Sequence, residues 1–289
     1  MSMAEVNAGK SRITTVERAG LTFDVLDEGP LDGEPVVLLH GFPERATSWR
    51  YVAPILNAAG YRTLAMDQRG YSPGARPKRR RDYRVPELVA DVKTLIDAVG
   101  GSAHVVGHDW GAMVAWSVAA DHPAAVRTLT AVSVPHPAAF LKSFVRSRQV
   151  LMSWYMAMFN LPRVPELLVR RKPEFFDLQL RKGGMTADDV ERFHREIVDD
   201  GALTGGLNWY RALPLSDPRD VRRKVTVPTT LVWSDGDVAL HRWGAEHTVE
   251  WVDAPYRFVE LDGVSHWIPT EAPDALADAI LSRVSGKDL

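Results

Sequence analysis

The fold of this chain is decided by HVVGHDWGA, residues 104–112. The apolar residues 103–106 are typical of a short buried strand, and residues 112–120, AMVAWSVAA, are typical of a helix. Between them the pentapeptide GHDWG, residues 107–111, leaves room only for a sharp turn. Gly107 and Gly111 suit such a turn, because a side chain at either position would obstruct it.

The pentapeptide has the Gly-x-Ser-x-Gly spacing of a nucleophile elbow, with Asp109 in the serine position. At such an elbow the central side chain stands clear at the end of the sheet, above the N-terminus of the next helix. A carboxylate there is already ionised at neutral pH, and the helix-end amides help to keep it so. Taken alone, Asp109 could equally be a residue that only caps the helix.

The chain around the elbow alternates between strand and helix patterns. We expect strands at 13–17 and 21–26 as a hairpin, and further strands at 35–39, 61–66, 126–134, 227–233 and 257–261. We expect helices at 47–59, 87–99, 243–252 and 272–284. This alternation predicts a mostly parallel central sheet with helices on both faces.

The alternation stops between about residues 137 and 215. Met152, Tyr155, Met156 and Phe159 form one helical stripe, and helical patterns continue through 173–181 and 187–198. A stretch of this length without strands is an all-helical insertion rather than a loop. The predicted organisation is a core from 1–136, a helical cap from 137–216 and the rest of the core from 217–289.

Composition excludes several classes of protein. The 289 residues include no cysteine, which excludes disulfides, thiol catalysis and metal sites with cysteine ligands. The net charge of -2 does not favour nucleic acid, and we interpret the basic run at 78–81 as a solvated loop. Residues 1–12 are polar, so we expect no signal peptide, and no run reaches the length of a membrane span. We therefore expect a soluble, cytoplasmic protein with neither nucleic acid nor a membrane as partner.

Candidate partners for Asp109 follow the last two predicted strands, because chemistry collects at the carboxyl ends of such strands. Asp235 and Asp237 follow the first of these strands and His266 follows the second, which is the order nucleophile, acid, histidine of an α/β-hydrolase triad. We choose Asp237 as the acid and expect Asp235 to hydrogen-bond its own turn. We interpret the remaining candidates, His40, His104 and His108, as structural.

Four motifs together resemble the soluble epoxide hydrolases of the α/β-hydrolase fold. They are HGFPE at 40–44, DQRGY at 67–71, GHDWG at 107–111 and GLNWYR at 206–211. The resemblance covers nearly the whole chain after the first ten residues, and the four motifs are specific only as a set. It implies an α/β-hydrolase core with a helical cap, whose two tyrosines donate hydrogen bonds to the epoxide oxygen. The residues that match are Tyr210, closely, and Tyr155, more loosely.

The chemistry of an aspartate nucleophile agrees with this resemblance. Asp109 needs no deprotonation to open an epoxide and form an alkyl ester, which water activated by His266 and Asp237 then hydrolyses. The backbone N–H groups of Phe42 and Trp110 would hold the oxyanion. The scheme needs an apolar epoxide and water but no metal or organic cofactor. Tryptophans beside the proposed site suggest an aromatic-lined pocket: Trp154, Trp209 and Trp267.

Other readings of the same motifs stay open. A haloalkane dehalogenase shares the fold and the aspartate, and a luciferase-like or non-catalytic relative shares the elbow. Phe42, where a dehalogenase usually has asparagine, and the tyrosine pair favour the epoxide. The sequence allows a homodimer without implying one, and it leaves the choice of epoxide and its stereochemistry open.

Overall fold

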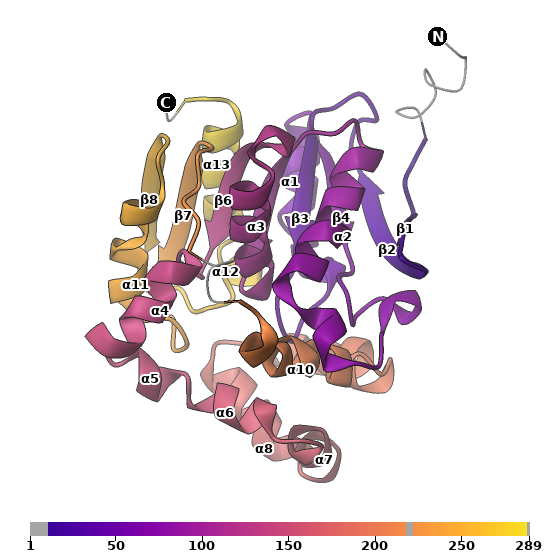
Figure 1. Ribbon diagram of the computed structural model, residues 1–289, viewed down its shortest axis with the longest axis vertical. Coiled ribbons are helices and arrows are strands. Elements are labelled where there is room, and N and C mark those ends of the chain that lie inside the picture. Colours follow the sequence, from indigo (N-terminus) through magenta and orange to yellow (C-terminus); the bar gives the residue numbers. More distant parts are fainter. Residues whose placement is uncertain (1–10, 218–221, 288–289) are drawn as a thin grey trace.

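The computed structural model describes residues 11–217 and 222–287. Its described strands form one sheet in the order β1-β2-β4-β3-β5-β6-β7-β8 (Figure 1). Their bounds are β1 (Thr15–Arg18), β2 (Leu21–Glu28), β3 (Pro35–Leu39), β4 (Arg62–Met66), β5 (Ala103–His108), β6 (Val126–Val132), β7 (Thr229–Ser234) and β8 (Tyr256–Leu261). The first two strands pair antiparallel, as does β2 with β4, and all other pairs are parallel. The predicted mostly parallel sheet and its amino-terminal hairpin are confirmed.

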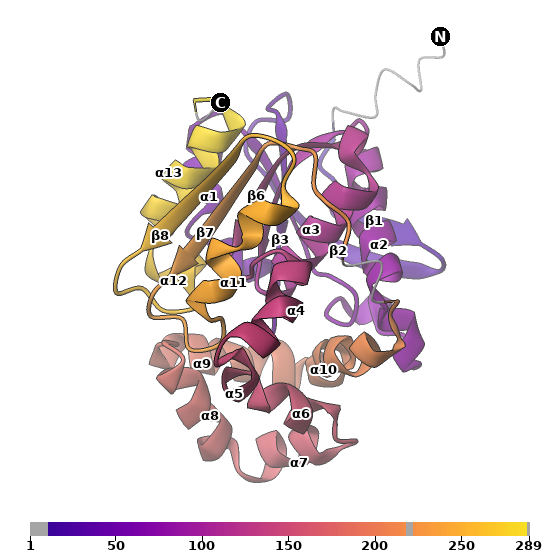
Figure 2. The same cartoon turned by 60° about the vertical axis from the view of Figure 1, so that its left-hand side comes forward.

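Helices cover both faces of the sheet, because its central strands are apolar on both sides. Val36 and Leu38 of β3 pack toward α1 (Ala53–Ala58) and α13 (Pro273–Val284). Their neighbours Val37 and Leu39 belong to the opposite core, with α2 (Val85–Ala98), α3 (Trp110–Asp121) and α11 (Arg242–Glu246). Figure 2 shows α1 and α13 on one side of the sheet and α2, α3 and α11 on the other.

Two expected core helices are broken in the structure. The segment 47–59 consists of a 3-10 turn, η1 (Ala46–Trp49), followed by α1, with Pro54 in its first turn. Proline has no N–H to continue the ladder of η1, but it suits the start of a new helix. The segment 243–252 likewise divides into α11 and the 3-10 turn η7 (Thr248–Trp251), and α12 (Ile268–Glu271) precedes α13.

Between β6 and β7 the described residues form helices and turns without a strand. The bounds are α4 (Pro137–Arg146), α5 (Gln149–Met152), α6 (Trp154–Asn160), α7 (Val164–Arg171), α8 (Pro173–Lys182), α9 (Ala187–Phe193), the π-helical turn η5 (His194–Asp199), α10 (Leu203–Ala212) and η6 (Leu213–Leu215). They lie together at the carboxyl ends of the parallel strands (Figures 1 and 2). The exact domain limits, 1–136, 137–216 and 217–289, stay a prediction. Among the helices described, none is long and apolar enough to cross a membrane.

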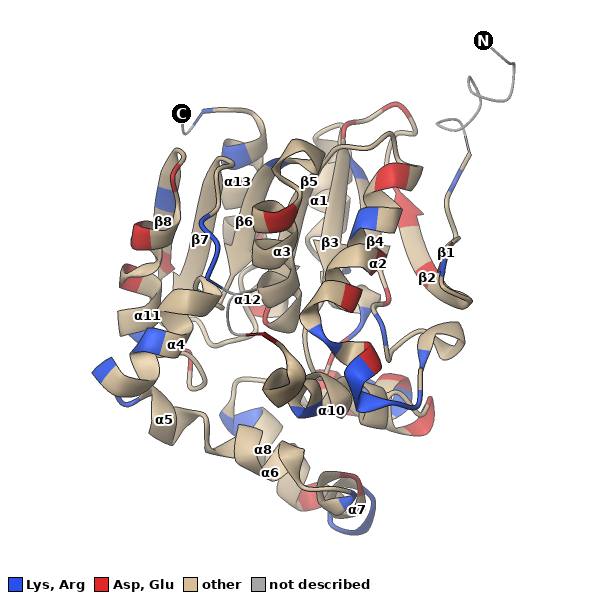
Figure 3. Cartoon of the chain, in the orientation of Figure 1, with Lys and Arg blue, Asp and Glu red and all other residues tan. Residues whose placement is uncertain are grey.

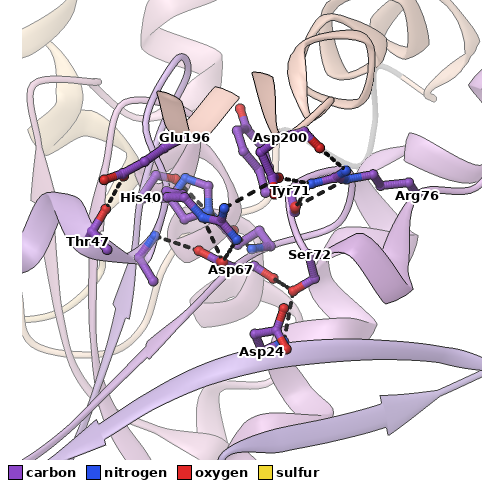
Figure 4. Close-up of polar contacts among 12 residues, drawn as sticks. Asp24, His40, Thr47, Asp67, Tyr71, Ser72, Arg76, Glu196 and Asp200 are labelled. Atoms are coloured by element: carbon purple, nitrogen blue, oxygen red, sulfur yellow. Dashed lines mark hydrogen bonds and ion pairs between the residues drawn. The ribbon is translucent and has the colours of Figure 1, made fainter. Parts of the chain in front are cut away.

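Polar contacts fasten this cap to the core beside the loop after β3. The hydroxyl of Thr47 donates to Glu196 at 2.5 Å, and Arg76 pairs with Asp200 (Figure 4). Both acceptors lie in the segment joining α9 to α10. The cap is therefore anchored on the segments that follow β3 and β4.

Candidate active site

The elbow places Asp109 between β5 and α3 in a conformation that few residues adopt. Its φ of 52° and ψ of -121° lie outside the usual regions, as expected for the centre of a strained strand-to-helix turn. Gly111 allows the turn, because a Cβ there would lie 2.1 Å from the carbonyl oxygen of Leu39. Asp109 occupies the N-cap position of α3 but makes no side-chain capping hydrogen bond. The helix-capping reading of Asp109 is therefore wrong.

Backbone amides hold the carboxylate of Asp109. The Phe42 N–H donates to Oδ1 at 2.8 Å, and a hydrogen bond from the Trp110 backbone also acts on this carboxylate. The loop after β3 comes this close only because residue 41 is glycine, since a Cβ on Gly41 would lie 2.3 Å from the Cβ of Asp109. The amides of Phe42 and Trp110, which we expect to stabilise an oxyanion, thus already face the Asp109 carboxyl group on which that oxyanion would form.

Buried polar side chains hold the loop that carries Phe42 in place. His40 accepts from the Gln68 N–H at 3.1 Å through Nε2 and lies 3.0 Å from the Gly41 oxygen through Nδ1. Asp67 binds the side chain of Arg45 and accepts from the Ala46 N–H at 2.7 Å (Figure 4). His40 is structural, as the sequence indicates. Contacts between the HGFPE and DQRGY motifs therefore hold the backbone N–H of Phe42 in position.

His266 lies between the two carboxylates. Its Nδ1 is 2.7 Å from Oδ2 of Asp237, and its Nε2 is 3.5 Å from Oδ2 of Asp109. The other oxygen of Asp237 accepts from the N–H groups of Ala239 and Leu240, at 2.7 and 2.9 Å. Asp235 instead accepts from Gly263 in the loop after β8, rather than from its own turn as we expected. The structure thus brings Asp109, His266 and Asp237 together and leaves Asp235 outside the group.

The charges in this group stabilise one another. Burial by itself raises the pKa of Asp109, but the hydrogen bond and positive charge of His266 outweigh it and leave the pKa below its ordinary value. Burial lowers the pKa of His266, but the negative charge of Asp237 and the contact with Asp109 raise it to about 10. At neutral pH the site therefore holds an imidazolium between two carboxylates.

Two cavities meet at Asp109. The first, of about 240 Å³, lies beside α4 and includes Trp110, Met113, Phe140 and Leu213 in its lining. The second, of about 320 Å³, lies beside α6 and α8 and includes Phe42, Phe159, His266 and Trp267. Asp109, Tyr155 and Tyr210 line both. A molecule bound at Asp109 thus has apolar space on two sides.

Two of the three tryptophans expected in the pocket wall are there. Trp154 and Trp267 line the second cavity. Trp209 lines neither cavity, contrary to our expectation. Its indole N–H donates to the Arg69 carbonyl at 2.7 Å, and its ring packs edge-on against that of Trp110. Trp209 therefore packs behind the pocket wall. Adjacent residues of a helix point in different directions, so Trp209 does not face the cavities as the residue beside it does.

Tyr155 on α6 and Tyr210 on α10 come together over Asp109. Their ring centroids are 6.2 Å apart, and Tyr210 also packs edge-on against Trp110 at 4.9 Å. Burial first, and the charge of Asp109 second, raise the pKa of each phenol above its ordinary value. Both therefore remain protonated donors at neutral pH.

Comparison with known proteins agrees with this geometry. Residues 34–273 match the family model described as the alpha/beta hydrolase fold. The chain is 32% identical over 289 residues to Epoxide hydrolase 4 of Homo sapiens, an alignment covering 94% of this chain and 78% of that protein. It belongs to the epoxide hydrolases of the α/β-hydrolase fold.

Further relatives extend the same likeness over most of the chain. The AB hydrolase superfamily protein YfhM of Bacillus subtilis is 36% identical over 280 residues, covering 94% of this chain and 97% of that one. The crystal structure of Epoxide Hydrolase A from Mycobacterium thermoresistibile superposes with a TM-score of 0.81 at 29% identity, covering 94% and 97%. This epoxide hydrolase is thus an enzyme of the predicted fold class.

Glu44 is a buried site neighbour to which the sequence assigned no role. Burial raises its pKa to about 8, while Arg50 opposes this rise and Asp189, His266 and Asp109 have smaller effects. Its Oε2 lies 3.9 Å from Nδ1 of His108. The glutamate belongs to the HGFPE motif, but only the tertiary structure shows that it lies behind the elbow. Other apolar cavity residues, such as Met113, Phe140 and Leu213, were also missed, because the linear pattern does not separate the core of the cap from the pocket wall.

We expect acid to destabilise this epoxide hydrolase before most of its carboxylates titrate. Burial lowers the pKa of His40 and of His108 to about 4, against 6.5 for a free histidine. Below pH 6.5 the unfolded chain binds protons that the folded chain does not, so stability falls as the pH decreases toward 4. The slope is up to about 1.4 kcal/mol per pH unit for each histidine. Glu44 offsets one of the two histidines, because its raised pKa adds stability as the pH falls from about 8 to 4.5.

Urea unfolding between pH 7 and pH 5 measures this effect. His266 does not mask it, because its raised pKa contributes stability that is complete below pH 6.5 and is lost only as the pH rises through about 10. A midpoint that stays constant from pH 7 to pH 5 would contradict the burial of uncharged imidazoles at both positions.

Proposed function

We propose that this enzyme opens an epoxide to a vicinal diol through a covalent ester of Asp109. The observation that carries the proposal is the different surroundings of the two Asp109 oxygens. Oδ1 accepts from the Phe42 N–H, whereas Oδ2 lies 3.5 Å from Nε2 of His266. One oxygen is thus placed to become the carbonyl oxygen of an ester, and the other to attack.

In the first step, Oδ2 of Asp109 attacks one epoxide carbon and breaks its bond to the epoxide oxygen. The developing alkoxide takes a proton from Tyr155 or Tyr210, which line both cavities together with Asp109. The phenols suit this role because they stay protonated at neutral pH and add no charge to the site. The step leaves an ester, a hydroxyl group and one phenolate.

Ester formation changes the state of His266. The negative charge of Asp109 is one cause of the high pKa of His266, and esterification removes that charge. The pKa of His266 then falls, and its proton returns to the phenolate. The neutral imidazole, held by Asp237 at 2.7 Å, is now a base. The enzyme thus gains its base only once there is an ester to hydrolyse.

In the second step, His266 takes a proton from water as that water attacks Cγ of Asp109. The oxyanion forms at Oδ1, where the N–H groups of Phe42 and Trp110 stabilise it. The bond from Cγ to Oδ2 then breaks, and the departing alkoxide takes the proton of the new carboxyl group. The diol keeps the original Oδ2, and Asp109 keeps the oxygen from water.

The cavities support an apolar epoxide as the substrate. The lining of each is rich in aromatic and aliphatic side chains, including Phe140 in the first cavity and Trp154 and Trp267 in the second. An epoxide with an apolar substituent on each carbon would place one in each cavity.

A single turnover in heavy-oxygen water tests the ester. With enzyme in excess over a styrene-oxide-like substrate, we expect the label in Asp109 and unlabelled diol, read by mass spectrometry of peptide and product. Direct attack of water on the epoxide would place the label in the first diol instead, and that result would overturn the proposal. Haloalkanes are assayed in parallel, because release of halide would indicate a haloalkane dehalogenase instead.

A further inference from the structure

The cap segment from α4 to α6 exposes large apolar side chains. The exposed fractions are 45% for Leu141, 81% for Val145, 54% for Val150, 69% for Leu151 and 52% for Trp154. We call these five residues the α4–α6 face. So many exposed apolar side chains within 14 residues of sequence indicate a surface that contacts something other than water.

The same stretch is purely cationic. Residues 137–165 include Lys142, Arg146, Arg148 and Arg163 but no Asp or Glu. The whole chain has a net charge of -2, so this stretch, at +4, leaves -6 for the rest. Lys142 pairs with Glu250 at 3.1 Å, while Arg146, the last residue of α4, and Arg148, just before α5, are exposed. Figure 3 shows the blue of Lys and Arg at the corner between α4 and α5. Apolar and basic side chains therefore share one edge of the molecule.

The α4–α6 face also adjoins both cavities that reach Asp109. Leu141 lines the first cavity and Trp154 lines the second, although about half of each side chain is exposed. Residues of this face therefore extend from the outer surface to the space in front of the reactive carboxylate. A partner bound to the α4–α6 face would therefore lie beside the two cavities that reach Asp109.

We propose that the α4–α6 face binds the surface of an anionic lipid bilayer. Helical surfaces that combine Lys and Arg with Trp, Leu and other apolar residues lie in the interface of such bilayers, and tryptophan prefers that depth. Anionic headgroups complement Arg146 and Arg148. A second copy of this chain would bring one cationic face against another, so charge disfavours self-association there.

Such binding adds a route for the substrate. An apolar epoxide concentrated in the bilayer would enter the cavities past Leu141 and Trp154. This part rests on the proposed epoxide chemistry, whereas binding to lipid does not. We expected no membrane partner because no run of the sequence reaches the length of a membrane span, but binding at the bilayer surface needs no such run.

Sedimentation of the full chain with lipid vesicles tests the proposal. We expect binding to phosphatidylcholine vesicles that contain phosphatidylglycerol, weakening as salt is added, and little binding to phosphatidylcholine alone. The Arg146→Glu/Arg148→Glu variant should bind at least about 25-fold more weakly, since one cation near an anionic surface contributes about fivefold. Val145→Glu/Leu151→Glu should also lose binding, because its apolar contacts are replaced by charge.

Matched controls lie at the other end of the sheet. Arg127, at the start of β6, and Leu31, before β3, are 40% and 38% exposed. Arg127→Glu and Leu31→Glu should bind vesicles like the wild type. All variants should hydrolyse a water-soluble epoxide at the wild-type rate, which separates failure of the proposed reaction from failure of this inference.

Three results would overturn the inference. The first is no binding, or equal binding to both kinds of vesicle. The second is wild-type binding by both double variants. The third is a stable wild-type dimer in light scattering that Val145→Glu/Leu151→Glu dissociates, because the face would then be a self-association surface.

Discussion

The His266→Gln variant is expected to gain the mass of one epoxide molecule on Asp109 and then stop. Attack by Oδ2 needs the carboxylate and the phenols, whereas hydrolysis of the ester needs a base beside it. Glutamine can hydrogen-bond Asp237 but cannot take a proton from water. Removing a general base costs roughly 10²- to 10⁴-fold, so multiple turnover should fall by at least that factor while the first alkylation persists. Intact-protein mass spectrometry with time measures both.

His194 provides the matched control for this change. Its Nε2 lies 2.7 Å from Asp177, in a histidine–aspartate pair of the cap that lines neither cavity. His194→Gln should turn over normally and accumulate no ester. If His266→Gln stays unmodified while bound substrate is demonstrated independently, the division of labour between Asp109 and His266 is wrong.

Replacing both cap tyrosines should nearly abolish alkylation. Tyr155→Phe and Tyr210→Phe each leave one phenol over Asp109, whereas the double variant leaves none. The alkoxide must then form without an acid, so the alkylation rate should fall by roughly 10²- to 10⁴-fold, and by more than the two single losses imply. Pre-steady-state rates of the wild type, both single variants and the double variant with one epoxide measure this.

Tyr256→Phe controls for removal of a buried phenol. Tyr256 lies in β8, where burial raises its pKa well above its ordinary value and where its hydroxyl has no hydrogen-bond partner among the described residues. This variant should alkylate like the wild type. If the double tyrosine variant alkylates at nearly the wild-type rate, the two cap tyrosines are packing residues. The case for an epoxide over a haloalkane would then lose its main support in the site.

The elbow and the order of the strands were predictable because local rules govern them. Glycine at 107 and 111 is required wherever a strand turns sharply into a helix, and Asp109 must then occupy the exposed centre of the turn. Parallel strands bring their carboxyl ends to one edge, so the loops that carry Asp237 and His266 had to meet Asp109 there. The same alternation located the helical insertion, because no strand pattern interrupts it.

Helix continuity was less predictable because competing local interactions decide it. Pro54 starts α1 anew after η1, although the apolar spacing of 47–59 predicts one helix. The stripe from Met152 to Phe159 divides between α5 and α6 at Ser153. The spacing of apolar residues shows which residues face the core. It does not show where a helix is interrupted, because a change of partner in one backbone hydrogen bond is enough to interrupt it.

The sequence by itself determined the α/β-hydrolase architecture, the position of the nucleophile and the type of each partner. Only the tertiary structure decided that Asp237, the acid chosen from the sequence, reaches His266 while Asp235 does not, that Trp209 points away from the cavities, and that the α4–α6 face is exposed beside them. Each of these depends on the direction of a side chain relative to a distant segment. Such directions follow from the packing of whole elements, because residues one or two apart in a loop or helix point to different neighbours.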